Sequence, residues 1–190
     1  MAKLVVNVGG MFSGKSTELI RQGERHLLAG HKVVFIKPAT DKRYSDTKIV
    51  THTGANVEAT VVDVNKSFLF DVKGTDVVLI DEVQFFTKRI IPTIWCLLDK
   101  GIDVYCSGLD MDYLGDGFET VKELMAIADT VNKLHAVCKH CGEDAVHTAK
   151  KNFHEIGGDQ ERIELGSDDL YIPLCRDCYI EFMVSGRDKS

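Results

Sequence analysis

Residues 7–18 read NVGGMFSGKSTE, and this segment limits the fold more than any other part of the chain. From Gly9 to Ser16 it fits the pattern G-x-x-x-x-G-K-[ST], in which glycines let the backbone turn its N–H groups toward an anion. The lysine of such a loop contacts the β- and γ-phosphates of a nucleotide, and the serine hydroxyl is a ligand for Mg²⁺. The pattern therefore predicts a nucleoside triphosphate site but leaves the reaction open.

The segments on either side of this loop support the same interpretation. KLVVNV precedes it and has the apolar, β-branched character of a buried strand. After it, Leu19, Ile20 and Leu27 recur at helical spacing, and Gly30 is a stop signal. The loop would then lie at a helix N-terminus, whose dipole favours phosphate. The alternative, a chance glycine-rich turn, would not require a strand before it and a helix after it.

Further along the chain, strand-like and helix-like segments alternate. We expect strands in residues 31–38, 57–62, 76–82 and 103–109, and helices in 64–74, 87–101 and 119–131. The polar segment 39–54 is expected to be a long loop. Such alternation predicts an α/β fold with a mostly parallel sheet flanked by helices, and ligands in these sheets bind outside the carboxyl ends of the strands. We place this P-loop domain at residues 1–134, where the alternation ends.

The segment LIDEVQFF supplies a second part of the chemistry. An apolar strand that ends in Asp is the Walker B pattern, so Asp81 is expected to hold Mg²⁺ directly or through water. Glu82 is expected to point elsewhere, because successive strand residues alternate in direction. An acid here orients water in a hydrolase and accepts the hydroxyl proton in a kinase. Alternatively, the two acids only end a strand.

Four of the six cysteines form two C-x₂-C pairs, CKHC and CRDC. This spacing predicts a structural Zn²⁺ site, and it defines a small second domain at residues 135–190. A disulfide pairing is the alternative that a reducing cytosol disfavours. His140 is a further candidate ligand, although four thiolates complete the shell: Cys138, Cys141, Cys175 and Cys178. Cys96 and Cys106 lie in apolar segments and are expected in the core.

The overall charge limits the class of partner. The net charge is −6, and the pI is about 5.6. Nucleic-acid binding depends on clustered Lys and Arg, so we expect no nucleic-acid partner. The apolar runs are too short to span a membrane, and the N-terminus lacks signal-peptide features. A cytoplasmic protein is the expectation.

Several motifs in the same order resemble the type II thymidine kinase family over nearly the whole chain. They are GGMFSGKST, KPATDKRYSDTKIVTHTG, DEVQFF, GLDMDYLGDGF, KLHAVCKHCGEDAVHT and the pair IGG and YIPLCRDCY. The resemblance implies transfer of the γ-phosphoryl group of ATP to the 5′-hydroxyl of thymidine, with Mg²⁺. It implies that the zinc domain carries a lasso over the base, and that the chain forms a homo-oligomer, commonly a tetramer. Deoxyuridine is a further candidate substrate.

The resemblance also implies roles for individual residues, with Glu82 as the catalytic base. The expected phosphate and metal residues are Gly9, Gly10, Met11, Phe12, Ser13, Gly14, Lys15, Ser16, Asp41, Arg43, Asp81 and Gln84. The expected nucleoside residues are Met11, Phe85, Leu109, Tyr113, Phe118, Thr148, Tyr171 and the lasso residues Phe153, His154, Glu155, Ile156 and Gly157.

The chain also departs from the family pattern. Gly10 stands where many members have Pro, and Lys150 stands where Arg is frequent, so a bidentate phosphate contact there is in doubt. The segment of residues 159–170 is longer than the corresponding segment of many family members, and we expect it to form a solvent-exposed surface loop. Two other functions stay open: a P-loop ATPase with a zinc knuckle, and a nucleotide-sensing module without catalysis.

Overall fold

The computed structural model describes the chain apart from residues 42–46, 52–53, 70, 152–169 and 186–190. At its centre is a six-stranded sheet in the order β5-β2-β6-β7-β1-β8, and all its neighbouring strands run parallel. The expected sheet is therefore confirmed. The strands are β1 (Leu4–Val8), β2 (Val33–Pro38), β5 (Thr60–Val62), β6 (Val77–Ile80), β7 (Asp103–Gly108) and β8 (Thr130–Lys133).

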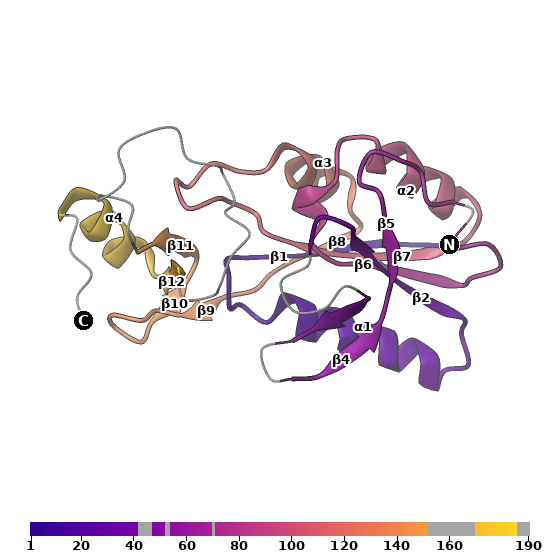
Figure 1. The fold of residues 1–190 in the computed structure, drawn as a ribbon, viewed down its shortest axis with the longest axis horizontal. Helices are drawn as coiled ribbons and strands as arrows, with labels where there is room; N and C mark the ends of the chain where they lie inside the picture. The colour runs from indigo at the N-terminus through magenta and orange to yellow at the C-terminus, as the bar shows by residue number, and fades with distance from the viewer. Residues whose placement is uncertain (42–46, 52–53, 70, 152–169, 186–190) are drawn as a thin grey trace.

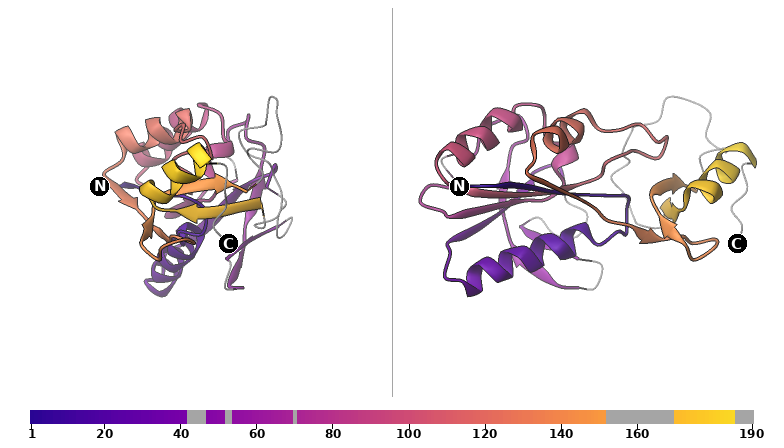
Figure 2. Two further views of the ribbon diagram at one scale, coloured as in Figure 1. Left: turned by 90° about the vertical axis from the view of Figure 1, so that its left-hand side faces the viewer. Right: turned by 180° about the vertical axis from the view of Figure 1, so that it is seen from behind.

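Helices cover both faces of this sheet (Figures 1 and 2). Helix α1 (Lys15–Leu28) packs on one face, where Leu19 and Ile20 contact strand residues such as Phe35 and Tyr105. Helices α2 (Ile90–Asp99) and α3 (Glu119–Ile127) lie on the opposite face, over the larger core cluster. The central strands are apolar on both faces because both are covered, as expected for a parallel sheet.

Some local predictions were wrong. Residues 64–74 form turns rather than a helix where they are described, and the segment 39–54 contributes a strand to a hairpin of β3 (Lys48–Val50) and β4 (Asn56–Glu58). Helix α3 ends at Ile127, because the next residues extend as the edge strand β8 beside β1. Cys106 is buried as expected, but Cys96 is partly exposed on α2.

The C-terminal segment forms a small unit with a separate core. It contains β9 (Ala136–Val137), β10 (Asp144–Ala145), β11 (His147–Lys150), β12 (Tyr171–Leu174) and α4 (Arg176–Ser185). Strands β9 and β10 pair antiparallel, as do β11 and β12, and α4 packs on them through Tyr179 and Phe182. The unit follows β8 directly in the chain and lies beside the end of β1 that leads into the P-loop (Figure 1).

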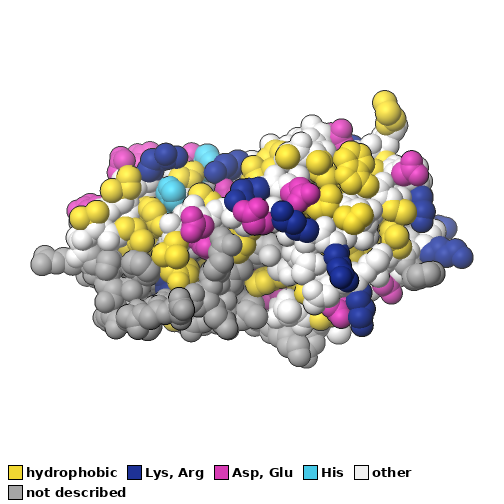
Figure 3. Space-filling model, turned by 90° about the horizontal axis from the view of Figure 1, so that it is seen from above, with side chains coloured by type: hydrophobic (Ala, Val, Ile, Leu, Met, Phe, Trp, Pro, Cys, Tyr) yellow, Lys and Arg dark blue, Asp and Glu magenta, His cyan; other side chains and the backbone are white. Residues whose placement is uncertain are grey.

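On the side of the molecule where α2 and α3 lie, acidic and basic side chains are interspersed on the surface (Figure 3). Lys88 lies 3.9 Å from Glu119 and 3.5 Å from Glu123, and Lys133 lies 3.0 Å from the buried Asp110.

In the part of the chain that the structure describes, no helix is both long and apolar enough to cross a membrane.

Candidate active site

The phosphate-binding loop joins the end of β1 to the start of α1, as the sequence predicts. Gly9 has φ 151°, and a Cβ atom there would lie 2.2 Å from the carbonyl oxygen of Leu134. Gly14, at φ 83°, is the N-cap of α1. Two different constraints thus require glycine, namely a close backbone approach at Gly9 and a left-handed conformation at Gly14.

Side chains within the loop hold its shape. The Ser13 hydroxyl donates to the carbonyl oxygen of Gly10 at 2.9 Å, and Lys15 Nζ donates to the same oxygen at 2.7 Å. The Lys15 side chain is buried although it is charged. A buried cation requires hydrogen-bonding or charged partners, and a phosphate bound in the pocket would be a further partner for Lys15. The loop therefore has the charge and shape that its motif predicts.

Asp81 directly follows β6, lines the same pocket as this loop and is buried. Its Oδ2 accepts a 2.9 Å hydrogen bond from the Ser16 hydroxyl. Burial, and next the neighbouring Glu82 carboxylate, raise the pKa of Asp81 to about 6, although hydrogen bonds from Ser107 and Ser16 act in the opposite direction. A hydroxyl and a carboxylate oxygen held together are ligands suited to Mg²⁺.

Glu82 does not point away from Asp81, and that prediction was wrong. The strand ends at Ile80, and Glu82 adopts φ 53°, so the alternation of strand residues no longer applies. Both acids line one pocket with the P-loop. Among the described residues other than glycine, positive φ occurs at Phe12 and Glu82, and both line that pocket. Backbone strain of this kind concentrates at functional sites.

Gln84 lies in the short 3₁₀ helix η1 (Val83–Phe85) that follows Glu82. Its amide nitrogen donates to the Glu82 carboxylate, and its amide oxygen accepts from the Leu109 N–H at 3.1 Å. The amide of Gln84 thus orients the carboxylate of Glu82 in this structure.

The pocket also contains cations that the sequence analysis missed. Lys37, at the carboxyl end of β2, is buried, and its Nζ lies 3.9 Å from an oxygen of Asp41. The sequence could have indicated Lys37, because it is a charged residue at the carboxyl end of an apolar strand, where ligands bind in parallel sheets. Lys48 of β3 is a further lining residue, and no pattern in the sequence pointed to it. Arg43 lies outside the described residues.

A second, smaller hollow adjoins the first through Met11 and Leu109. It brings together five of the predicted nucleoside residues, together with Met111 and Asp112; the five are Met11, Leu109, Tyr113, Thr148 and Tyr171. Buried Lys150 has its Nζ 5.6 Å from the centre of the Tyr113 ring. These residues come from four separate segments of the chain, namely the P-loop, residues 109–113, β11 and β12.

Other predicted nucleoside residues are placed differently. Phe118 is buried in the main core, Phe85 is partly exposed in η1, and neither lines the two hollows. Their part in nucleoside binding stays a prediction. Residues 153–157 of the expected lasso, and residues 159–169 of the long segment before Leu170, lie outside the described part of the chain.

The four paired cysteines meet in the C-terminal unit. Their sulfur atoms all lie within 4.8 Å of one another, and Sγ of Cys141 and Cys175 are 3.6 Å apart. That separation is far beyond a disulfide bond and close to the roughly 3.8 Å expected between thiolates around tetrahedral zinc. His140 is not part of this cluster, which therefore has four thiol ligands for a metal such as zinc.

Together, the parallel sheet, the P-loop and the paired acids define a P-loop nucleotide-binding protein, to which a cluster of four cysteines that could hold a metal is added. The family model for thymidine kinase matches residues 2–179. A thymidine kinase of Pseudothermotoga lettingae is 39% identical over 178 residues, covering 93% of this chain and 94% of the relative. One of Bacteroides fragilis is 39% identical over 188 residues, covering 99% and 92%. The chain belongs to the thymidine kinase family.

Among solved structures, an AMPPCP-bound DnaA of Aquifex aeolicus is similar over 71% of this chain and 41% of its own, with 14% identity and a TM-score of 0.46. This distant likeness has no part in the family assignment.

Proposed function

We propose that this chain transfers the γ-phosphoryl group of ATP to the 5′-hydroxyl of thymidine, with deoxyuridine as a weaker candidate substrate. The observation that carries the proposal is the shared pocket of Lys15, Asp81 and Glu82, joined through Met11 and Leu109 to a second hollow that Tyr113 and Tyr171 line with aromatic rings. A phosphate cradle beside a hollow lined by aromatic rings suits a transfer between two bound substrates.

In this proposal the residues have separate roles. Lys15 binds the transferred phosphate, and Ser16 and Asp81 hold Mg²⁺, which when bound neutralises charge that develops on the phosphate oxygens. Glu82 accepts the proton of the 5′-hydroxyl as that oxygen bonds to phosphorus and ADP leaves. Gln84 keeps the Glu82 carboxylate turned toward the pocket. Lys37 and Arg43 balance the negative charge of the phosphates, and Asp41 orients the Lys37 ammonium group, which lies 3.9 Å from one of its oxygens.

The cysteine cluster is proposed to hold one structural Zn²⁺. Its four thiolates would fix both ends of the segment between Cys141 and Cys175, which carries Thr148 and Tyr171 into the nucleoside hollow. We further propose two units, 1–134 and 135–190, with a homotetramer as the assembly and the cytoplasm as the location.

The P-loop ATPase is the second candidate, and thymidine dependence separates the two. The purified chain is incubated with ATP, Mg²⁺ and each deoxynucleoside in turn, and ADP and nucleoside monophosphate are measured. The proposal expects ADP and dTMP in equal amounts with thymidine, and little ADP without a nucleoside. Equal ATP turnover with and without thymidine would refute the kinase function.

A further inference from the structure

A buried hydroxyl that belongs to none of the recognised motifs contacts the acid at the end of β6. Ser107 lies on β7 with no exposed surface, and its hydroxyl donates a hydrogen bond to Oδ1 of Asp81. The backbone N–H of Glu82 donates to the same oxygen at 3.0 Å. Oδ1 therefore accepts two hydrogen bonds, one from a strand of the sheet and one from the turn that follows β6.

The second oxygen of Asp81 has a different kind of partner. Oδ2 accepts from the hydroxyl of Ser16, which lies in the first turn of α1 beside the phosphate pocket. This hydroxyl is a candidate ligand for the metal that accompanies ATP. One carboxylate oxygen is thus anchored to the sheet, while the other is joined to a residue of the phosphate pocket.

From this asymmetry we propose that Ser107 is a positioning residue, which fixes the Asp81 carboxylate so that Oδ2 is presented to the metal of the bound nucleotide. The inference rests on the proposed function only in needing a metal–ATP complex at this loop. A carboxylate rotates freely about its terminal bond unless donors hold it. A ligand that is already oriented loses less entropy when the metal binds.

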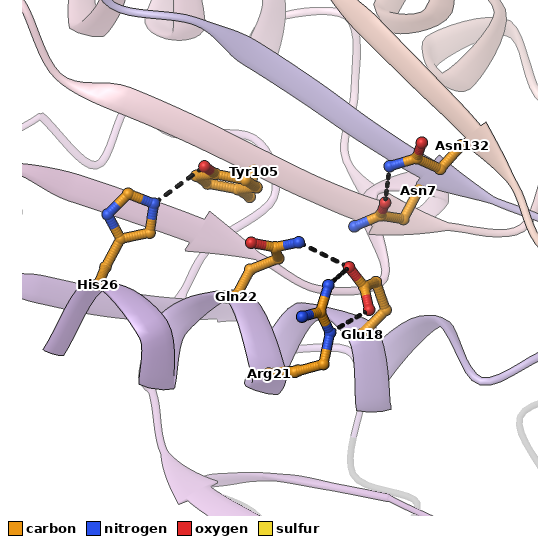
Figure 4. Close-up of polar contacts among 7 residues, drawn as sticks. All are labelled: Asn7, Glu18, Arg21, Gln22, His26, Tyr105 and Asn132. Atoms are coloured by element: carbon orange, nitrogen blue, oxygen red, sulfur yellow. Dashed lines mark hydrogen bonds and ion pairs between the residues drawn. The ribbon is translucent and has the colours of Figure 1, made fainter. Parts of the chain in front are cut away.

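The neighbouring strands continue the same polar row across the sheet. Ser107 is in register with Asn7 of β1, and Asn7 is in register with Asn132 of β8. Asn132 Nδ2 donates to Asn7 Oδ1 at 2.9 Å, as Figure 4 shows. Asn7 is fully buried, and its Nδ2 has no acceptor among the described residues. An ionised carboxylate only accepts hydrogen bonds, so the Ser107 hydroxyl gives its single proton to Asp81, and the two asparagines extend the buried polar row beside it.

A purely structural role is the alternative, since buried polar groups require partners wherever they occur. Thr120 provides the comparison. It is also buried, and its hydroxyl donates to the carbonyl oxygen of Phe86 at 2.9 Å, but it does not contact Asp81. Ser107→Ala and Thr120→Val each remove one buried hydroxyl, so a general loss of stability would affect both.

The test measures metal binding directly. Mn²⁺, which takes the same oxygen ligands as Mg²⁺, is titrated by electron paramagnetic resonance into the protein–ATP complex of the wild type, Ser107→Ala and Thr120→Val. ATP affinity in EDTA and Tm are measured alongside. A hydrogen bond to a charged group is worth about tenfold or more in an equilibrium constant. We expect Ser107→Ala to weaken Mn²⁺ binding about tenfold, with ATP affinity in EDTA unchanged, and Thr120→Val to leave Mn²⁺ binding unchanged.

A change below threefold in Ser107→Ala, or an equal loss in both variants, overturns the proposal. The outcome does not depend on the identity of the phosphoryl acceptor. If the wild type fails to phosphorylate thymidine, the proposed function fails, while the Mn²⁺ titration still decides the role of Ser107.

Discussion

The backbone N–H of Met11 donates a 2.9 Å hydrogen bond to Oγ1 of Thr148, which links the phosphate-binding loop to β11 of the C-terminal unit. A Cβ atom at Gly10 would lie 3.0 Å from that same oxygen, so the loop leaves little space beside the Thr148 side chain. Met11 also lines both hollows. The contact therefore connects the cysteine-bearing unit to the place where phosphates are expected to bind.

Replacing Thr148 by Val keeps the shape of the side chain but removes the acceptor. The N–H of Met11 is then left without this partner, and we expect a loss of about 1–3 kcal/mol in the free energy of unfolding. ATP affinity without nucleoside should fall as well, because the loop is held less firmly. Thr148→Ser retains the hydroxyl and is the control. Normal ATP affinity in Thr148→Val would mean that the contact does not order the loop.

Gly9→Ala tests the close approach to Leu134. The added methyl group would clash with a backbone carbonyl that cannot rotate away, in addition to the strain of positive φ. We expect at least about 3 kcal/mol of lost stability and loss of ATP binding. Gly30→Ala is matched to it, since φ is 82° there and no atom lies within 4 Å. This control should lose only about 1–2 kcal/mol and keep ATP binding; equal effects would contradict the argument from the clash.

The metal prediction concerns Cys138 and Cys175. Protein purified without chelators should contain one zinc per chain by elemental analysis, and Cys138→Ser or Cys175→Ser should release it, because serine is a poor zinc ligand. Thymidine binding should fail before ATP binding, since Thr148 and Tyr171 lie between the two pairs. Cys96→Ser removes a thiol outside the cluster and should keep the zinc. Zinc-free wild-type protein would refute the assignment.

The pKa of Asp81 leads to a prediction about stability and pH. Its folded value of about 6 lies above the unfolded value, so the folded state binds the extra proton. Stability is therefore lost as pH rises from about 4 to about 6, and the loss persists above that range. At about 1.36 kcal/mol per pH unit between the two values, the penalty is on the order of 3 kcal/mol. In chelator, Asp81→Asn should unfold at a higher temperature than the wild type at pH 7.5 and show no advantage at pH 4.

The P-loop and Asp81 could be predicted because each depends on a short, contiguous pattern. The direction of Glu82 could not, since the end of β6 at Ile80 and the positive φ that follows are set by the turn and not by the pattern of the strand. The hairpin of β3 and β4 was missed for a related reason, because three-residue strands have too few residues to show an alternation.

Contacts between distant segments were the hardest to predict. Met11 and Thr148 are 137 positions apart, and Ser107 meets Asp81 only because β6 and β7 are neighbours in register. A sequence pattern identifies residue types at the strand ends, but the order of the strands decides which of them meet. Lys37 is an intermediate case, since its place at the end of β2 was visible but its partner Asp41 was not.

The last prediction concerns Glu82, where the kinase and ATPase functions differ. Glu82→Gln keeps the size of the side chain, and its amide oxygen can still accept the hydrogen bond from Gln84. Lys15, Ser16 and Asp81 are unchanged, so the affinity for Mg-ATP should stay within a few-fold. Loss of a general base lowers a rate by about 10²–10⁴-fold, which is roughly 3–5 kcal/mol of barrier. We therefore expect kcat for thymidine phosphorylation to collapse while ATP binding persists.

The control for this variant is Glu24→Gln, which makes the same change at an exposed position of α1. It should leave both kcat and ATP affinity unaltered. Single-turnover measurements with saturating thymidine separate the chemical step from product release, and the defect of Glu82→Gln should appear in the chemical step. If this variant phosphorylates thymidine at a near-normal rate, Glu82 is not the proton acceptor, and the strained backbone at this position would serve only to place the neighbouring Asp81.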